Sequence, residues 1–246
     1  MLSVRLARRT QVTKIAIFVE GQTEQLFAER LIEEIAGRKR VTITKRRAVG
    51  GGQSGARKIT TLETSNGVNN RYFAVLVDCG ADNRVKSDIR DNYDKLVDAG
   101  FGFIIGIRDV YPDFSHSEIP KLRSGLNYKL KTVPVQVLFV LGIMEIEAWF
   151  MSEYTHFERL NAELTIPRIR TQFGFDPSHD NLELRDRPAE DLKRIYSLAN
   201  ISYDKKKANT SLTLNTLSYE TLYLTLPARI PDLKALIEHV DQFLSE

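Results

Sequence analysis

The chain has 246 residues, of which 42% are hydrophobic and 27% are charged, and its formal net charge at pH 7 is +3. This composition excludes a disordered chain and is sufficient for one large domain, or for a core domain with a smaller appendage. The weak positive charge permits an anionic partner but does not require one.

The cellular compartment is predicted from one cysteine and from the absence of membrane signals in the sequence. Cys79 has no second cysteine with which to form an internal disulfide, which suits a reducing cytoplasm. The four scattered histidines do not stand at zinc-ligand spacing from it, so a zinc site is not expected. No apolar run reaches the about 18 residues that cross a bilayer, and the basic start, residues 1–14, lacks the apolar centre of a signal peptide. We therefore expect a cytoplasmic protein with no membrane partner.

Strand and helix signals alternate through the first 150 residues. Apolar runs predict strands at 15–19, 41–44, 72–77, 101–107 and 133–140, and helical spacing predicts helices at 23–36, 87–99 and 117–130. Strands that are continuously apolar and separated by helices indicate a mostly parallel sheet covered on both faces. We expect an α/β domain with helices on both faces of its sheet over residues 1–150.

The pattern changes to helices and turns over residues 151–246. The last helix, 231–244, places its large apolar residues at good helical spacing. We interpret this part as a helical appendage packed on the α/β core. The run Lys205-Lys206-Lys207 is interpreted as a solvated loop rather than as a binding patch.

Acidic residues follow four of the predicted strands, where an open α/β sheet forms its ligand sites. The sets are Glu20 with Glu24, Asp78 with Asp82, Asp109 with Asp113, and Glu145 with Glu147. One acid after a strand means little, because aspartate also begins turns and caps helices. Four sets at one edge of a sheet predict a cation site, and carboxylate oxygens suit Mg²⁺ or Mn²⁺ better than Zn²⁺.

The pair Glu145 and Glu147 stands in the apolar stretch 142–150. An ionised side chain in such surroundings is costly unless it is paired. Residues two apart on a helix point about 200° apart, so we expect one of them to face the acidic centre unless the segment begins irregularly. The alternative is that one caps the helix or pairs with an arginine.

Basic residues and glycines lie between the first and second acidic sets. The glycine-rich loop 50–55 is followed by Ala56 and Arg57, so it does not match a Walker phosphate loop. It can still present backbone N–H groups to a phosphate. The residues expected to contact phosphates, in a salt-sensitive manner, are Lys45, Arg46, Arg47, Arg57 and Lys58.

The segment Val19-Glu20-Gly21-Gln22-Thr23-Glu24 resembles the first motif of the Toprim superfamily, in which an apolar strand is followed by Glu-Gly, two residues and an acid. The second Toprim motif is Asp-x-Asp. Asp78 matches its first aspartate, but Gly80 stands in place of the second. The segment 142–150 resembles a helix of small stand-alone Toprim-type proteins from prokaryotic defence loci.

The resemblance implies a magnesium-dependent nuclease of the overcoming-lysogenization-defect type. It would cleave DNA or RNA, including tRNA, in anti-phage defence, beside an ABC-type ATPase. It makes Glu20 the general acid/base and also a metal candidate, and Asp78 a metal ligand within the catalytic set, with Glu24 and Glu147 as further catalytic candidates. Asp82, Asp109 and Glu145 complete the metal candidates, with Asp82 or Asp109 in place of the missing acid.

Two other functions stay open at this point. A non-catalytic module could keep the Toprim shell and dock on an ATPase or on nucleic acid, and the incomplete Asp-x-Asp pair favours it. A small-molecule or receiver-like phosphoryl-transfer domain is disfavoured because no lysine stands convincingly at a late strand end. For the assembly, base rates favour a homodimer.

Overall fold

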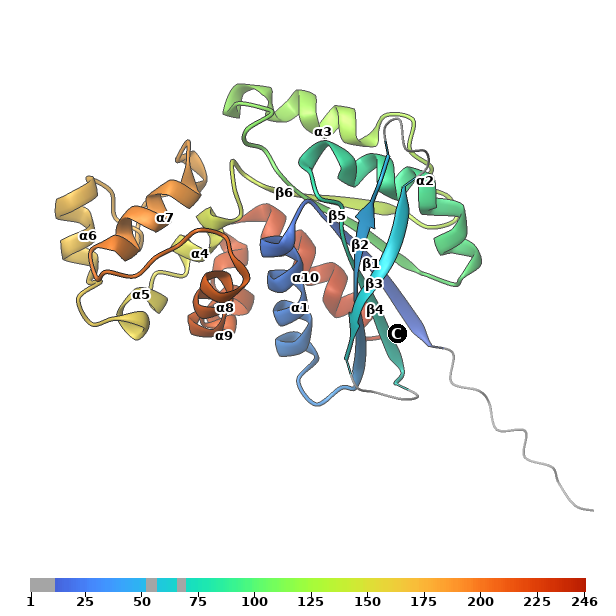
Figure 1. The fold of residues 1–246 in the computed structure, drawn as a ribbon, viewed down its shortest axis with the longest axis horizontal. Coiled ribbons are helices and arrows are strands. Elements are labelled where there is room, and N and C mark those ends of the chain that lie inside the picture. The colour runs from blue at the N-terminus through green and yellow to red at the C-terminus, as the bar shows by residue number, and fades with distance from the viewer. Residues whose placement is uncertain (1–11, 52–56, 66–69) are drawn as a thin grey trace, which may run out of the picture.

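The computed structural model describes residues 12–51, 57–65 and 70–246, without the side chain of Asp82. Six strands form one sheet in the order β3-β2-β4-β1-β5-β6, with helices on both faces (Figure 1). All neighbouring strands are parallel except β2 and β3, which are antiparallel. The predicted α/β fold with a mostly parallel sheet is therefore confirmed.

The strands are β1 (Thr13–Val19), β2 (Val41–Val49), β3 (Lys58–Thr64), β4 (Tyr72–Asp78), β5 (Phe103–Asp109) and β6 (Val137–Gly142). Strand β1 lies between β4 and β5, and its last residue, Val19, pairs with Asp78 on one side and Ile107 on the other. On the next strands, β2 and β6, Arg47 pairs with Asp78 and Gly142 pairs with Asp109. Glu20, which follows β1, and Asp78 and Asp109, which end β4 and β5, thus share one edge of the sheet.

The two faces of the sheet are covered by different helices. Along β1, Ile15, Ile17 and Val19 belong to a core shared with α1 (Gln22–Ala36) and α10 (Pro231–Phe243). The alternate residues Ala16 and Phe18 pack on the other face, in a core shared with α2 (Val85–Asp98). Because successive side chains of a strand point to opposite faces, a strand covered on both sides must be apolar throughout.

Short helices make up most of the region after β6. They are α4 (Glu147–Ser152), α5 (His156–Leu160), α6 (Ile166–Phe173), α7 (Pro188–Ser197), α8 (Lys207–Thr216) and α9 (Tyr219–Leu224), with the 3₁₀ turns η4 (Leu182–Leu184) and η5 (Leu226–Ala228). Their buried residues join those of the sheet in one hydrophobic cluster. In α10, Phe243 contacts Tyr72 of β4 and Phe103 of β5 edge to face, with ring centroids 5.5 and 6.0 Å apart. The expected helical region therefore packs directly on the sheet.

Several predicted boundaries were wrong. Strand β2 continues through the basic cluster Lys45-Arg46-Arg47, and the polar strand β3 was not predicted. The strand expected at 133–140 is β6, which begins at Val137. The helix expected at 117–130 is α3 (Ile119–Asn127), preceded by the 3₁₀ turn η3 (His116–Glu118). Part of the glycine-rich loop, residues 52–55, lies outside the described residues.

Within the described ranges, no helix combines the length and the apolar character that crossing a bilayer requires.

Candidate functional site

Three carboxylates meet where β1 and β5 end. Glu20, Glu24 and Asp109 each offer one oxygen, and these oxygens all lie within 4.8 Å of one another. Glu24 is 2% exposed and Asp109 is 1% exposed, whereas Glu20 is half-buried. Two carboxylates of this centre, Glu24 and Asp109, are therefore shielded from solvent, and Glu20 is partly accessible to it.

The backbone fixes two of these side chains. Glu20 directly follows β1, and its Oε2 accepts a hydrogen bond from the backbone N–H of Asp109 at 2.8 Å. Asp109 ends β5, and its Oδ1 accepts one from the backbone N–H of Ile146 at 2.9 Å. Glu24 lies in the first turn of α1, where an acid suits the positive end of the helix dipole. The carboxylates are held in place before any ligand arrives.

Gly142, the last residue of β6, leaves room for the Asp109 carboxylate. A Cβ atom at this position would lie 2.3 Å from Asp109 Oδ1 and 2.9 Å from the backbone nitrogen of Ile146. No other residue type fits here without moving the carboxylate. Gly21 is less demanding, because its backbone is extended and a Cβ there would lie 3.4 Å from Glu24 Oε2, an ordinary contact.

Glu145 and Glu147 both face one cation, because the segment before α4 is irregular. Met144 has a left-handed backbone with φ of 58°, and α4 begins only at Glu147. Lys205 Nζ lies 3.1 Å from Glu145 Oε1 and 3.3 Å from Glu147 Oε1. Both acids thus contact the same ammonium group, which the irregular start named in the sequence analysis as the exception makes possible.

Tyr203 also contacts this pair, since its hydroxyl donates to Glu147 Oε1 at 2.8 Å. The second oxygen of Glu145, Oε2, accepts from the backbone N–H of Ala189 at 2.8 Å. By contrast, Glu147 Oε2 is buried and has no hydrogen-bond partner among the residues that the structure describes. An unsatisfied carboxylate oxygen is costly to bury, so this atom indicates a place for a ligand or a proton.

The concentration of negative charge changes the acidity of the site. Burial, followed by the charges of Glu20 and Glu24, raises the pKa of Asp109 well above its ordinary value. Burial likewise raises the pKa of Glu147, against the opposing effect of Lys205. Burial alone would lower the pKa of Lys205, but the surrounding carboxylates outweigh it and raise that pKa. The lysine is charged, and the acids compete for protons or for further cations.

Asp78 lies at the same edge of the sheet, but its carboxylate has other partners. Its Oδ2 lies 3.3 Å from Arg47 Nε, and its Oδ1 accepts from the backbone N–H of Gly80 at 2.8 Å. It is outside the group of three carboxylates. Asp82 begins the short turn η2 (Asp82–Arg84), and its side chain is outside the described part of the structure. Asp113 pairs with Arg108 at 2.7 Å.

The basic residues expected to contact phosphate fall into two groups. Lys45 pairs with Glu29 and Glu63, while Arg57 pairs with Asp88 at 2.9 Å and donates to the backbone oxygen of Cys79. The charges of Lys45 and Arg57 are therefore used in contacts within the protein.

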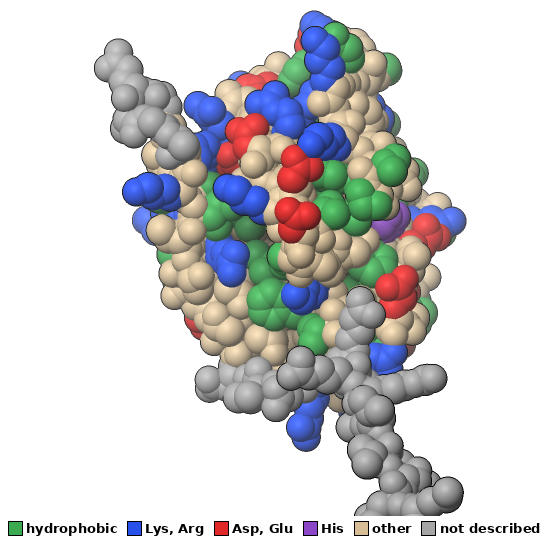
Figure 2. Space-filling model, turned by 90° about the vertical axis from the view of Figure 1, so that its right-hand side faces the viewer, with side chains coloured by type: hydrophobic (Ala, Val, Ile, Leu, Met, Phe, Trp, Pro, Cys, Tyr) green, Lys and Arg blue, Asp and Glu red, His purple; other side chains and the backbone are tan. Residues whose placement is uncertain are grey.

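The other three differ in exposure. Arg46 is half-buried, and its Nε has no hydrogen-bond partner among the described residues. Arg47 and Lys58 are exposed. Figure 2 shows Lys and Arg side chains interspersed with acidic ones on one side of the molecule, rather than a continuous basic surface.

One family model matches most of the chain. It covers residues 19–221 and carries the description "Domain of unknown function (DUF4276)". The chain belongs to this family. The matched range of this DUF4276 protein includes the carboxylate centre, Glu145, Glu147 and Lys205. No curated protein and no solved structure matches the chain.

The centre of this DUF4276 protein fits a hard divalent cation. Its donors are carboxylate oxygens, the ligands that such ions prefer. The structural observation that supports the fit is that one oxygen of each of Glu20, Glu24 and Asp109 lies within 4.8 Å of the others. Sequence reasoning missed Lys205 and Tyr203, which carry no local motif and reach the Glu145–Glu147 pair from more than 50 residues after Glu147.

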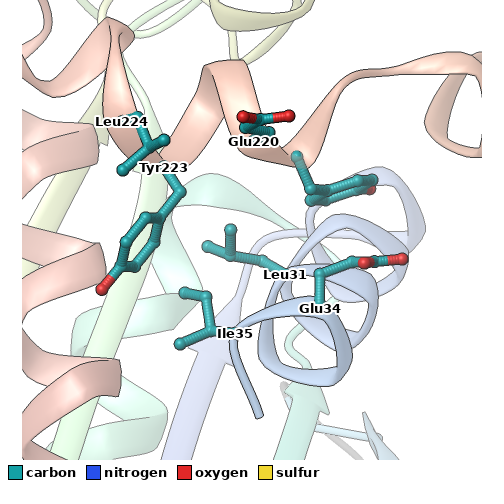
Figure 3. A pocket seen from close by; sticks show the side chains of 7 residues that line it. Leu31, Glu34, Ile35, Glu220, Tyr223 and Leu224 are labelled. Carbon is teal, nitrogen blue, oxygen red and sulfur yellow. The ribbon is translucent and has the colours of Figure 1, made fainter. Parts of the chain in front are cut away.

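A separate cavity of about 430 Å³ lies between α1 and α9 (Figure 3). Leu31 and Ile35 of α1 face Tyr223 and Leu224 across it, and Glu34 and Glu220 stand at its rim. The described lining includes none of the carboxylates of the centre, so the two features are distinct.

Proposed function

We propose that this protein is a metal-dependent phosphodiesterase that cleaves DNA or RNA. The observation that carries the proposal is the meeting of Glu20, Glu24 and Asp109 within 4.8 Å, with two of the three buried. Carboxylates brought this close repel one another unless a proton or a cation lies between them. The Toprim resemblance of the segment containing Glu20 and Glu24 supports phosphodiester cleavage over other metal-dependent reactions.

The proposed cofactor is Mg²⁺ or Mn²⁺, held by Glu20, Glu24 and Asp109. Such an ion would supply polarisation of a phosphoryl oxygen and a lower pKa for its bound water. Glu20 is the member of the centre that reaches solvent, and the N–H of Asp109 fixes one of its oxygens. These two properties suit a group that takes a proton from an attacking water or passes one to a leaving oxygen.

Arg47 is the proposed contact to a substrate phosphate. It lies at the carboxyl end of β2, which is two strands away from β1 at the same sheet edge. With strands about 4.8 Å apart, its backbone is about 10 Å from the end of β1. Its side chain is 56% exposed, so it can contact a nucleic-acid strand that binds at the carboxylate centre. Lys58, which is exposed on β3, extends the same surface.

The test is cleavage of plasmid DNA and of transfer RNA by the purified protein, with Mg²⁺ or Mn²⁺ and with a chelator. Glu20→Gln should lower the rate at least about 100-fold, the usual contribution of a general acid or base. Glu34→Gln is the matched control, because Glu34 is an exposed acid on α1 that pairs with Arg30. Cleavage by Glu20→Gln at the rate of Glu34→Gln would refute the assigned role.

One observation favours the non-catalytic module as a second candidate. Asp78, the remnant of the second Toprim motif, is paired with Arg47 rather than placed in the centre. A module of this kind would bind no divalent ion at the carboxylate centre, so calorimetric titration with Mn²⁺ separates the two functions. The defence role and the ABC-type ATPase partner stay predictions from the resemblance.

A further inference from the structure

We propose that the ammonium group of Lys205 occupies the cation position beside Glu145 and Glu147, so that the acids at this edge of the sheet bind one divalent ion and not two. The single ion would lie among Glu20, Glu24 and Asp109. This inference rests on the proposed function and fixes the number of ions with which that function operates.

The first argument is the position of the lysine. Its Nζ lies 3.1 Å from Glu145 Oε1 and 3.3 Å from Glu147 Oε1, which is where a second ion would have to bind. A fixed positive charge there repels a further cation. Lys205 has a left-handed backbone, with φ of 58°, a conformation uncommon for lysine. The fold therefore holds this residue in a specific conformation beside the two acids.

The second argument is the number of free oxygens. Glu145 has both of its oxygens occupied, Oε1 by Lys205 and Oε2 by the N–H of Ala189. Glu147 Oε1 forms an ion pair with Lys205 and accepts a hydrogen bond from the hydroxyl of Tyr203. Of the four carboxylate oxygens of Glu145 and Glu147, Glu147 Oε2 alone has no partner among the described residues. A single free carboxylate oxygen beside the positive charge of Lys205 is a poor site for a second divalent cation.

Removal of the ammonium group changes this count. With an uncharged side chain at position 205, Glu145 Oε1 becomes available beside Glu147 Oε2, while Glu147 Oε1 keeps the hydrogen bond from Tyr203. Two carboxylate oxygens from two residues, completed by water, can hold a second Mg²⁺ or Mn²⁺. A lysine and a second ion are therefore alternatives at the same place.

The experiment counts Mn²⁺ ions per chain, by calorimetry and by the electron paramagnetic resonance signal of free Mn²⁺. The wild type should bind one ion, and Lys205→Arg, which keeps the charge, should also bind one. Lys205→Met, of similar length but uncharged, should bind two. Lys206→Met is the matched control with one expected ion, because Lys206 is 81% exposed and pairs with Asp204.

Two ions on the wild-type protein would overturn the inference without any variant, and this result stands even if Lys205→Met does not fold. One ion on folded Lys205→Met would overturn it as well. No ion on the wild type would contradict the proposed metal-dependent function itself. The number of Mn²⁺ ions on the wild type thus distinguishes a failure of this inference from a failure of the proposed metal-dependent function.

Discussion

Replacement of Gly142 by alanine should remove the carboxylate centre and destabilise the fold together. The new Cβ would lie 2.3 Å from Asp109 Oδ1, and real Cβ atoms essentially never approach another atom closer than 3.0 Å, so the oxygen must move by at least 3.0 − 2.3 = 0.7 Å. That movement breaks its 2.9 Å hydrogen bond from Ile146. Overpacking and the loss of a buried bond to a charged group together cost about 3–5 kcal/mol.

The assay measures urea unfolding and Mn²⁺ titration on the same protein samples. For Gly142→Ala we expect a lower midpoint of unfolding and at least about tenfold weaker binding, or about 1.4 kcal/mol. Gly106→Ala is the matched control, since its Cβ would meet the side chains of Phe139 at 2.7 Å and Ile89 at 2.9 Å, away from the carboxylates. It should lower stability by about 1–3 kcal/mol with unchanged Mn²⁺ affinity. Equal loss of Mn²⁺ affinity in both variants, or none in Gly142→Ala, would refute the reasoning.

Three further predictions concern charge. Because the pKa of Asp109 is raised in the folded state, the stability of the metal-free protein should fall as pH rises through that pKa. Asp109→Asn should raise the melting temperature at pH 8 with a chelator by about 2 °C or more, roughly 1 kcal/mol, and should abolish Mn²⁺ binding. A lower melting temperature would contradict the proposed repulsion between Asp109 and the neighbouring carboxylates. Burial raises the pKa of Glu183 to about 7, and its Oε1 accepts a hydrogen bond from Nε1 of Trp149, the single tryptophan. The fluorescence of Trp149 should therefore change with an apparent pKa near 7. A change of the same kind in Glu183→Gln would rule out Glu183 as the titrating group. Arg57→Ala should cost about 3–5 kcal/mol, because it leaves the buried Asp88 without its ion-pair partner. Arg47→Ala should cost about 1 kcal/mol or less, because Arg47 is 56% exposed and Asp78 keeps its hydrogen bond from Gly80, but it should weaken nucleic-acid binding and reduce its salt slope by about 1. Equal stability changes in chemical denaturation would count against this difference.

The sequence was sufficient to predict the central part of the fold. Strands β1, β4 and β5 are buried on both faces, so their continuous apolar runs stand out from the helices between them. Strand β3 was missed because it is an exposed edge strand of polar residues, paired on one side only with β2. Its sequence, Lys58–Thr64, lacks the apolar content on which the other predictions depended.

The candidate site was predictable where residues follow strands. Glu20 and Asp109 lie at the ends of neighbouring parallel strands, so strand order alone brings them together. Asp78 also ends a neighbouring strand, but its ion pair with Arg47 depends on side-chain positions that the sequence does not show. Lys205 was interpreted as solvated because adjacent lysines usually are, and only the packing of the helical region places its ammonium group beside Glu145 and Glu147.

The position of α10 has a consequence for synthesis of the protein on the ribosome. Strand β1 ends at Val19 and α10 begins at Pro231, yet the two pack together on one face of the sheet. At about 5–20 residues per second, translation takes roughly 10–40 s to proceed from one to the other. During that interval the nascent sheet lacks the helix that covers this apolar face, so chaperone binding should be strongest before α10 is made.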